Sequence, residues 1–196
     1  MDVSHQRFNF CNYQHLLSMI TPAKSTFEKV NTHKNNGWSI VFTDGSRTEG
    51  NVAFSITSED GIFLSLKAMF PYSSIFSVEA AAIHEAMVLS IQKKTNTIIC
   101  SDSLSVIQAA SNHTCNKWET VNQIRHSLIK NSKSIKLLWV PGHTGIEGNT
   151  YADNAAKFAC NAPIIISPKT ERLDIKRHIN TCIIHKQRQS LKNYKH

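Results

Sequence analysis

The chain has 196 residues, which is room for one domain of ordinary size with tails. Apolar residues make up 41% of it, with only 7 Gly and 5 Pro, so the composition excludes a disordered chain and favours a globular one. The net charge is +8, yet residues 37–162 are neutral, whereas residues 163–196 carry eight Lys and Arg against two Asp and Glu. This basic C-terminal segment favours contact with nucleic acid over a merely solubilising tail.

The cysteines and the N-terminal residues indicate the cellular compartment of the protein. Five Cys, an odd number with no CxxC pair, favour a reducing environment. The first residues lack the charged-then-apolar pattern of a signal peptide, and no apolar run approaches membrane-spanning length. We therefore expect an intracellular protein of the cytoplasm or nucleus, with no membrane partner.

The predicted elements follow in chain order. Residues 1–36 hold a short apolar patch among polar residues, and we expect a loosely packed lead-in. Alternating and apolar runs predict strands at 38–43, 52–57, 62–68, 97–100 and 135–140, with Glu59-Asp60-Gly61 as a hairpin turn. Helical periodicity predicts helices at 77–92, 103–111, 116–130 and 149–160, the first with Ser77 as its N-cap.

The order of these elements predicts an α/β fold. Three strands joined by hairpins, followed by alternating helices and strands, indicate a mixed sheet that is antiparallel at first and parallel later, flanked by helices. Such sheets bind ligands beyond the carboxyl ends of their strands. We expect a lead-in over 1–36, one domain over 37–162, and a basic helical C-terminal extension over 163–196.

Two aspartates follow apolar strands, Asp44 in FTDGS and Asp102 in CSDS. If the two strands are neighbours in the sheet, both carboxylates emerge side by side, where they repel unless a cation neutralises them. Carboxylate oxygens are hard ligands that suit Mg²⁺ or Mn²⁺. Taken singly, each aspartate could instead simply end its strand in a turn.

Two further acids and a histidine complete the candidate site. Glu79 and Asp153 each lie in the first turn of a predicted helix, where an acid also favours the helix dipole. Glu85 is a rival to Glu79 that periodicity alone does not exclude. His143 lies in the Gly-rich loop PGHTGIEGN, although loop histidines are commonly just solvated. Together the four acids and the histidine suit metal-assisted hydrolysis.

The ordered motifs FTDGS, SVEAAAIHEA, CSDS and WVPGHTGIEGNTYAD resemble ribonuclease H of type one, and are most similar to the RNase H domains of non-LTR retrotransposons. The resemblance runs from about Trp38 to Cys160. It implies the RNase H-like fold with a five-stranded mixed sheet, and it selects Glu79 over Glu85, because the family glutamate is the first in that helix.

The resemblance also implies a mechanism and a substrate. Two Mg²⁺ ions, for which Mn²⁺ can substitute, would be held by the carboxylates of Asp44, Glu79, Asp102 and Asp153. In two-metal hydrolysis one ion activates the attacking water and the other stabilises the leaving 3′-oxygen. His143 is implied as an auxiliary catalytic residue for proton movement or product departure. The implied activity is endonucleolytic cleavage of the RNA strand of an RNA–DNA hybrid, leaving 5′-phosphate ends, with the 2′-hydroxyl and groove shape marking the RNA.

Some positions depart from the pattern or leave alternatives. Bacterial members have polar residues before the glutamate, where this chain reads Ile75-Phe76-Ser77-Val78. Trp118 could stack near a sugar or pack in the core. A binding module that kept the fold without useful turnover is the main alternative, and a transposase or integrase nuclease is disfavoured because the Glu79 and His143 patterns are present.

The C-terminal extension leaves a choice of its own. His178, Cys182 and His185 share one face of the predicted C-terminal helix, which would suit a metal but lacks a fourth ligand. Phosphate contacts by the basic residues of this helix, or a former link to the rest of a retroelement, are the favoured interpretation.

Overall fold

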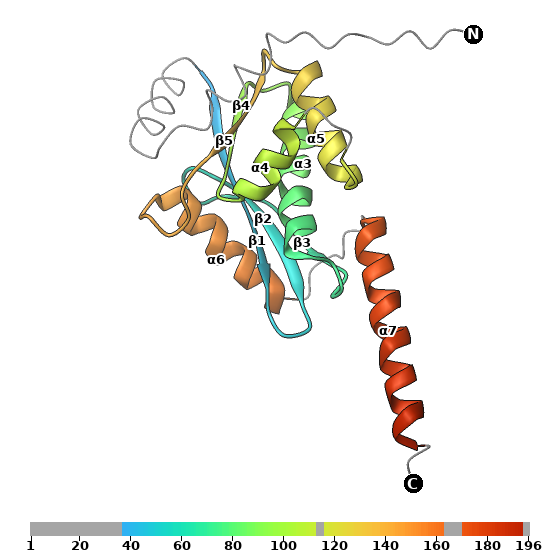
Figure 1. The fold of residues 1–196 in the computed structure, drawn as a ribbon. Helices are drawn as coiled ribbons and strands as arrows, with labels where there is room; N and C mark the ends of the chain where they lie inside the picture. Colours follow the sequence, from blue (N-terminus) through green and yellow to red (C-terminus); the bar gives the residue numbers. More distant parts are fainter. Residues whose placement is uncertain (1–36, 113–115, 163–169, 194–196) are drawn as a thin grey trace, which may run out of the picture.

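The computed structural model describes residues 37–112, 116–162 and 170–193. The predicted lead-in over 1–36 lies outside the described residues, as do Cys11 and Cys115. The described chain forms a five-stranded sheet in the order β3-β2-β1-β4-β5 (Figure 1). The strands are β1 (Ser39–Arg47), β2 (Val52–Ser58), β3 (Phe63–Met69), β4 (Thr97–Ser101) and β5 (Ile135–Trp139). The first three pair antiparallel, and β4 and β5 add parallel to β1, which confirms the predicted mixed sheet.

Helices cover both faces of this sheet (Figure 1). One face carries three helices: α3 (Ile75–Lys93), α4 (Leu104–Ser111) and α5 (Glu119–Lys130). The other face carries α6 (Glu147–Asn161), which packs on β1 and β2. The last helix, α7 (Arg172–Asn193), begins beside the domain and projects away from it (Figure 1).

Strand residues alternate between two cores, one on each face of the sheet. Val41 and Ile99 join the larger core beneath α3, whereas Phe42 and Cys100 join a smaller one with Ala152 of α6. This is the period of two expected when successive side chains point to opposite faces. Each fully buried aliphatic or aromatic side chain stabilises the fold by about 1.5–3 kcal/mol, so the two cores fix the sheet between its helix layers.

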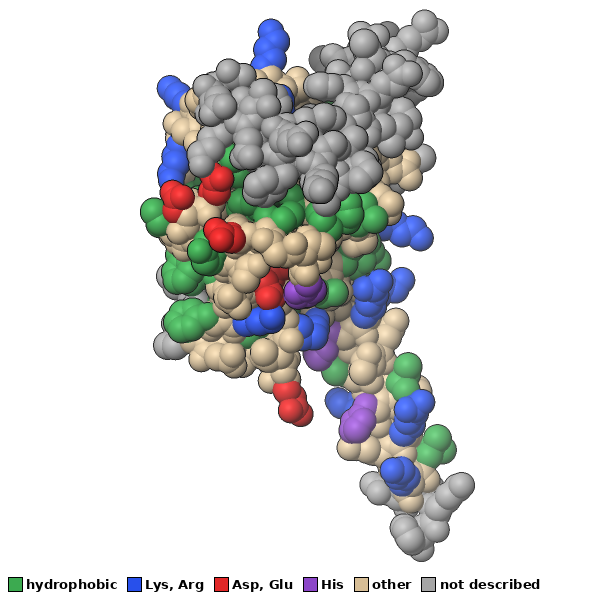
Figure 2. Space-filling model, turned by 90° about the vertical axis from the view of Figure 1, so that its left-hand side faces the viewer, with side chains coloured by type: hydrophobic (Ala, Val, Ile, Leu, Met, Phe, Trp, Pro, Cys, Tyr) green, Lys and Arg blue, Asp and Glu red, His purple; other side chains and the backbone are tan. Residues whose placement is uncertain are grey.

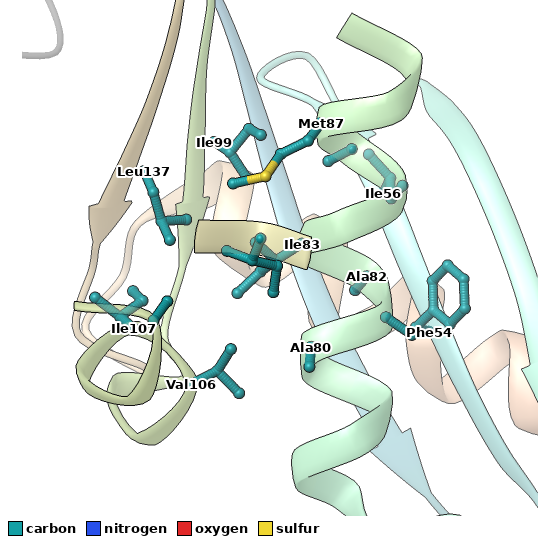
Figure 3. Close-up of a cluster of buried hydrophobic side chains, with 14 of the residues drawn as sticks. Phe54, Ile56, Ala80, Ala82, Ile83, Met87, Ile99, Val106, Ile107 and Leu137 are labelled. Carbon is teal, nitrogen blue, oxygen red and sulfur yellow. The ribbon is translucent and has the colours of Figure 1, made fainter. Parts of the chain in front are cut away.

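Helix α3 runs through the larger core. Ile83 and Met87 are fully buried and point from α3 toward the sheet, where Ile99 lies (Figure 3). Among the described residues, α3 is the one helix long and apolar enough to cross a membrane, with a mean hydropathy of 1.2, and 50% of its apolar window is buried inside the domain. The buried apolar residues of α3 therefore serve the core, and the acidic residues Glu79 and Glu85 interrupt its apolar run.

Several boundaries differ from the sequence prediction. The N-cap of α3 is Ser74, whose hydroxyl accepts from the backbone N–H of Ser77, so Ser77 lies inside the helix rather than at its cap. Strand β1 does not end at Asp44, because Asp44 pairs with Ser55 and the antiparallel ladder continues to Arg47. Pairing with β2 thus overrides the Asp-Gly turn signal. Helices α5 and α6 begin at Glu119 and Glu147, where the sequence predicted starts at 116 and 149.

Candidate metal centre

Two parallel strands bring Asp44 and Asp102 together. Strands β1 and β4 are neighbours, and Thr43 of β1 is in register with Ser101 of β4. The next residue on each strand is an aspartate, Asp44 within β1 and Asp102 directly after β4. The juxtaposition that the sequence predicted therefore follows from a parallel register in which both chains reach the same edge of the sheet.

Helix α3 adds the third carboxylate. One oxygen from each of Asp44, Glu79 and Asp102 lies within 4.8 Å of the other two. Asp44 and Glu79 are only 6% and 8% exposed. Glycine at Gly45 permits this approach, because a Cβ there would lie 3.1 Å from Cδ and 3.2 Å from the backbone N of Glu79. The rival Glu85 instead pairs with Lys67 of β3 at 2.5 Å.

Burial and mutual repulsion raise the pKa of two of these acids. Burial raises the pKa of Asp44 to about 7, with the negative charges of Asp102 and Asp153 adding to the effect and Lys157 opposing it. Burial also raises the pKa of Glu79 well above its ordinary value, helped by Asp44 and Asp102. Both groups therefore keep a proton to higher pH than an ordinary carboxyl group does, and a bound cation would offset the repulsion.

The donor set fits a divalent cation. The Oε2 atom of Glu79 is buried and has no hydrogen-bond partner among the residues that the structure describes. A buried carboxylate oxygen without a partner is costly, and a bound cation removes that cost. Three clustered carboxylates offer only hard oxygen ligands, the set that Mg²⁺ and Mn²⁺ prefer.

Two groups to which the sequence analysis assigned no role hold Asp102 in place. The side-chain amide of Asn149 donates to Oδ2 of Asp102 at 3.3 Å, and the indole N–H of Trp139 donates to the Asp102 carbonyl at 3.2 Å. A Cβ at Gly142 would lie 2.7 Å from the same Oδ2, so the carboxylate occupies space that only glycine leaves open. Asn149 is 4% exposed. In the sequence it lies three and seven residues before Ala152 and Ala156, and a polar residue on that Ala-rich helix face was the signal that could have identified it.

The structure does not bring the remaining two predicted residues into the three-carboxylate group. Asp153 of α6 pairs with Lys157 at 2.6 Å, although its charge still contributes to the raised pKa of Asp44. His143 is exposed in the loop between β5 and α6. Its φ of 56° lies in the left-handed region, which is uncommon for residues other than glycine.

The family model for RNase H matches residues 36–161. None of the curated proteins matches this chain. Among solved structures, an RNase H1 called LC11, isolated from compost by a metagenomic approach, is 18% identical with a TM-score of 0.48 and covers 64% of this chain and 96% of its own. The RNase H1 of the halophilic archaeon Halobacterium salinarum is 16% identical with a TM-score of 0.45, covering 64% of this chain and 98% of its own.

A third similar structure is LC11-RNase H1 in complex with an RNA/DNA hybrid, which is 17% identical with a TM-score of 0.44 and covers 63% of this chain and 96% of its own. The family match itself spans everything from β1 to α6, including all three clustered carboxylates. This chain therefore belongs to the RNase H family.

Proposed function

We propose that this protein is a metal-dependent endonuclease that hydrolyses the RNA strand of RNA–DNA hybrids. Membership of the RNase H family supports the reaction. The observation that carries the proposal is the cluster of Asp44, Glu79 and Asp102 within 4.8 Å, with a buried oxygen of Glu79 left without a partner. Such a cluster has little structural use, because like charges in a buried site destabilise the fold unless a cation joins them.

Each residue has a proposed part. Asp44, Glu79 and Asp102 hold divalent cations, and Asp153 is the proposed fourth ligand once it leaves Lys157. When bound, Mg²⁺ supplies Lewis acidity for hydrolysis of a phosphodiester, in the manner of two-metal sites. The proposed role of His143, which is exposed on its loop, is to move a proton or to assist product departure.

The test is cleavage of a labelled RNA–DNA hybrid in Mg²⁺ by the wild type, Asp102→Asn and Asp60→Asn. Asp60 is exposed in the β2–β3 turn, so its substitution removes a carboxylate away from the cluster. We expect cleavage by the wild type and Asp60→Asn, with 5′-phosphate products, and none by Asp102→Asn. Absence of cleavage by the wild type at any Mg²⁺ or Mn²⁺ concentration would sink the enzymatic proposal, and equal cleavage of single-stranded RNA would sink the proposed substrate.

One observation favours a second candidate, a nucleic-acid-binding or partner-binding module that keeps the fold without useful turnover. The ion pair of Asp153 with Lys157 occupies the fourth acid of the predicted set. In that case the wild type binds the hybrid in a gel-shift assay but cleaves nothing, and Asp102→Asn binds equally well. The cleavage assay above separates the two functions directly.

We also propose that helix α7 contacts the backbone of the nucleic acid. Its side chains from 175 to 192 are all exposed, and Figure 2 shows Lys and Arg side chains along the projecting helix. Replacing Lys186, Arg188 and Lys192 together by Gln should weaken hybrid binding and make it less sensitive to salt, by about one unit of slope for each phosphate that α7 no longer neutralises. An unchanged salt slope contradicts the proposed role of α7.

We also propose that this domain originated in a retroelement. The order of the sequence motifs and the residues within them support this origin. The expected observation is a reverse-transcriptase reading frame upstream of this coding sequence or of its close genomic copies. Copies that are flanked only by unrelated host genes throughout the genome contradict a recent origin of this kind.

A further inference from the structure

Two buried carboxylates mark the start of α7. Glu171, just before the helix, is 6% exposed, and Asp174 in its first turn is 1% exposed. They are the only acidic residues in the basic segment 163–196. An ionised group is seldom buried without a partner, so each should serve a specific contact inside the protein.

Glu171 serves the start of α5. Its two carboxylate oxygens accept from the backbone N–H groups of Glu119 and Thr120, at 3.0 and 2.7 Å. The first N–H groups of a helix have no partner within the helix, and an anion there is also favoured by the helix dipole. The residue at the N-cap position of α5 is Trp118, which makes no side-chain capping bond. Glu171 therefore supplies a cap from a distant part of the chain.

Asp174 serves the start of α3 in the same way. Its Oδ2 atom accepts from the backbone N–H of Ser74, the N-cap residue of α3, at 3.0 Å. In addition, the ring of His178 on α7 stacks on the ring of Tyr72, with centroids 4.7 Å apart. The first turn of α7 is thus fastened to the segment that leads into α3.

That segment also determines where Glu79 lies. Ser74 is five residues before Glu79, and its hydroxyl accepts from the N–H of Ser77 between them. On the other side, the guanidinium of Arg47 donates to the backbone carbonyls of Pro71 and Ser73. Arg47 belongs to β1, the strand that carries Asp44. The entry to α3 is therefore held between β1 and α7.

We propose that Asp174 is a positioning residue for Glu79: by capping α3 at Ser74 it fixes the first turns of the helix that delivers this carboxylate to the cluster. The C-terminal helix then belongs to the architecture of the active site and is more than a basic appendage. The consequence for metal binding rests on the proposed function, whereas the consequence for the order of α3 does not.

Glu171 provides the matched control. It lies on the same docked segment and makes an equivalent cap, but it caps α5, which carries none of the clustered acids. Loss of either cap weakens the docking of α7. Of the two, only Asp174 bonds directly to the N-cap residue of α3.

The experiment compares Asp174→Ala, Asp174→Asn and Glu171→Ala with the wild type by amide hydrogen exchange and by calorimetric titration with Mn²⁺. In Asp174→Ala we expect the amides of 75–80 to exchange about tenfold faster, the order of effect of losing one helix cap, and Mn²⁺ to bind more weakly by a similar factor. In Glu171→Ala the faster exchange is confined to the start of α5 and Mn²⁺ binding is unchanged. Asn can still accept from Ser74, so Asp174→Asn restores most of both properties.

Equal changes at α3 and in Mn²⁺ binding for Asp174→Ala and Glu171→Ala would overturn the proposal, because they indicate a general loss of stability. If Asp174→Ala does not fold, Asp174→Ser, which is polar and too short to reach Ser74, takes its place. A wild type that binds no Mn²⁺ defeats the proposed function alone, since the exchange pattern still decides whether Asp174 positions the start of α3.

Discussion

The ammonium of Lys157 lies 2.6 Å from Oδ2 of Asp153, one turn apart on α6. Asp153 is the proposed fourth ligand, so under the proposed function a cation that recruits its carboxylate would compete with Lys157. We expect Lys157→Met to lower the Mg²⁺ concentration that gives half-maximal thermal stabilisation. The pair is largely exposed at its lysine end, so stability without metal should change by less than about 0.5 kcal/mol.

Thermal unfolding across a Mg²⁺ titration measures the Mg²⁺ concentration that gives half-maximal stabilisation. The titration is run at about pH 8, because there Asp44, with a pKa of about 7, is mostly ionised. Lys157→Arg keeps the ion pair and serves as the control, with a midpoint close to that of the wild type. A higher Mg²⁺ requirement in Lys157→Met would show that Lys157 assists the site rather than competing for it.

The raised pKa of Asp44 predicts how stability depends on pH without metal. Its folded pKa is about 7 against an ordinary 3.8, so between these values the folded state binds more protons than the unfolded state. Stability therefore falls as pH rises through this window, and Glu79 acts in the same direction. Urea unfolding in EDTA at a series of pH values should show the midpoint falling from about pH 4 toward pH 7.

The isosteric variant Asp44→Asn tests the origin of this dependence. Asn cannot ionise, so in EDTA the variant should be more stable than the wild type at neutral pH and should show a flatter pH profile. Mg²⁺ should stabilise the wild type and leave Asp44→Asn nearly unaffected. A variant with the same pH profile as the wild type would place the titrating group elsewhere.

The loop before α6 should be sensitive at one glycine in particular. A Cβ added at Gly142 would lie 2.7 Å from Oδ2 of Asp102, whereas Gly145 in the same loop has open space but a φ of +81°. We expect Gly142→Ala to displace the Asp102 carboxylate from Asn149 and weaken Mn²⁺ binding severalfold. Gly145→Ala should cost about 1 kcal/mol of stability through backbone strain and leave Mn²⁺ binding unchanged. Calorimetry and urea unfolding of both variants separate these effects.

Local patterns were sufficient for the two aspartates of the three-carboxylate cluster. Asp44 and Asp102 each follow an apolar run, and neighbouring parallel strands deliver such residues to one edge of the sheet. The choice of Glu79 over Glu85 was different, because both glutamates fit the helical period and only the resemblance selected the first. The structure gives the physical reason: Lys67 on β3 neutralises Glu85, a contact between residues that periodicity cannot relate.

Long-range contacts account for what the sequence did not reveal. Asp174 caps a residue 100 positions away, and Glu171 caps residues more than 50 positions away, so both looked like ordinary acids in a basic helix. A partial signal existed at Trp118, which is a poor N-cap for α5 and implies a cap from elsewhere. Likewise, β1 passes through the Asp-Gly signal at Asp44 because pairing with β2 outweighs a local turn preference.

Substitution of His143 should affect cleavage but not metal binding, because this residue is exposed on a loop. It lies outside the carboxylate cluster, so His143→Ala should leave Mn²⁺ binding unchanged and slow steady-state cleavage, by up to about a hundredfold if it transfers a proton. Single-turnover cleavage distinguishes its two proposed parts: proton transfer slows both regimes, whereas assistance in product departure slows only multiple turnover. His126→Ala, an exposed histidine on α5, is the control. Weaker Mn²⁺ binding in His143→Ala would instead make His143 part of the metal site.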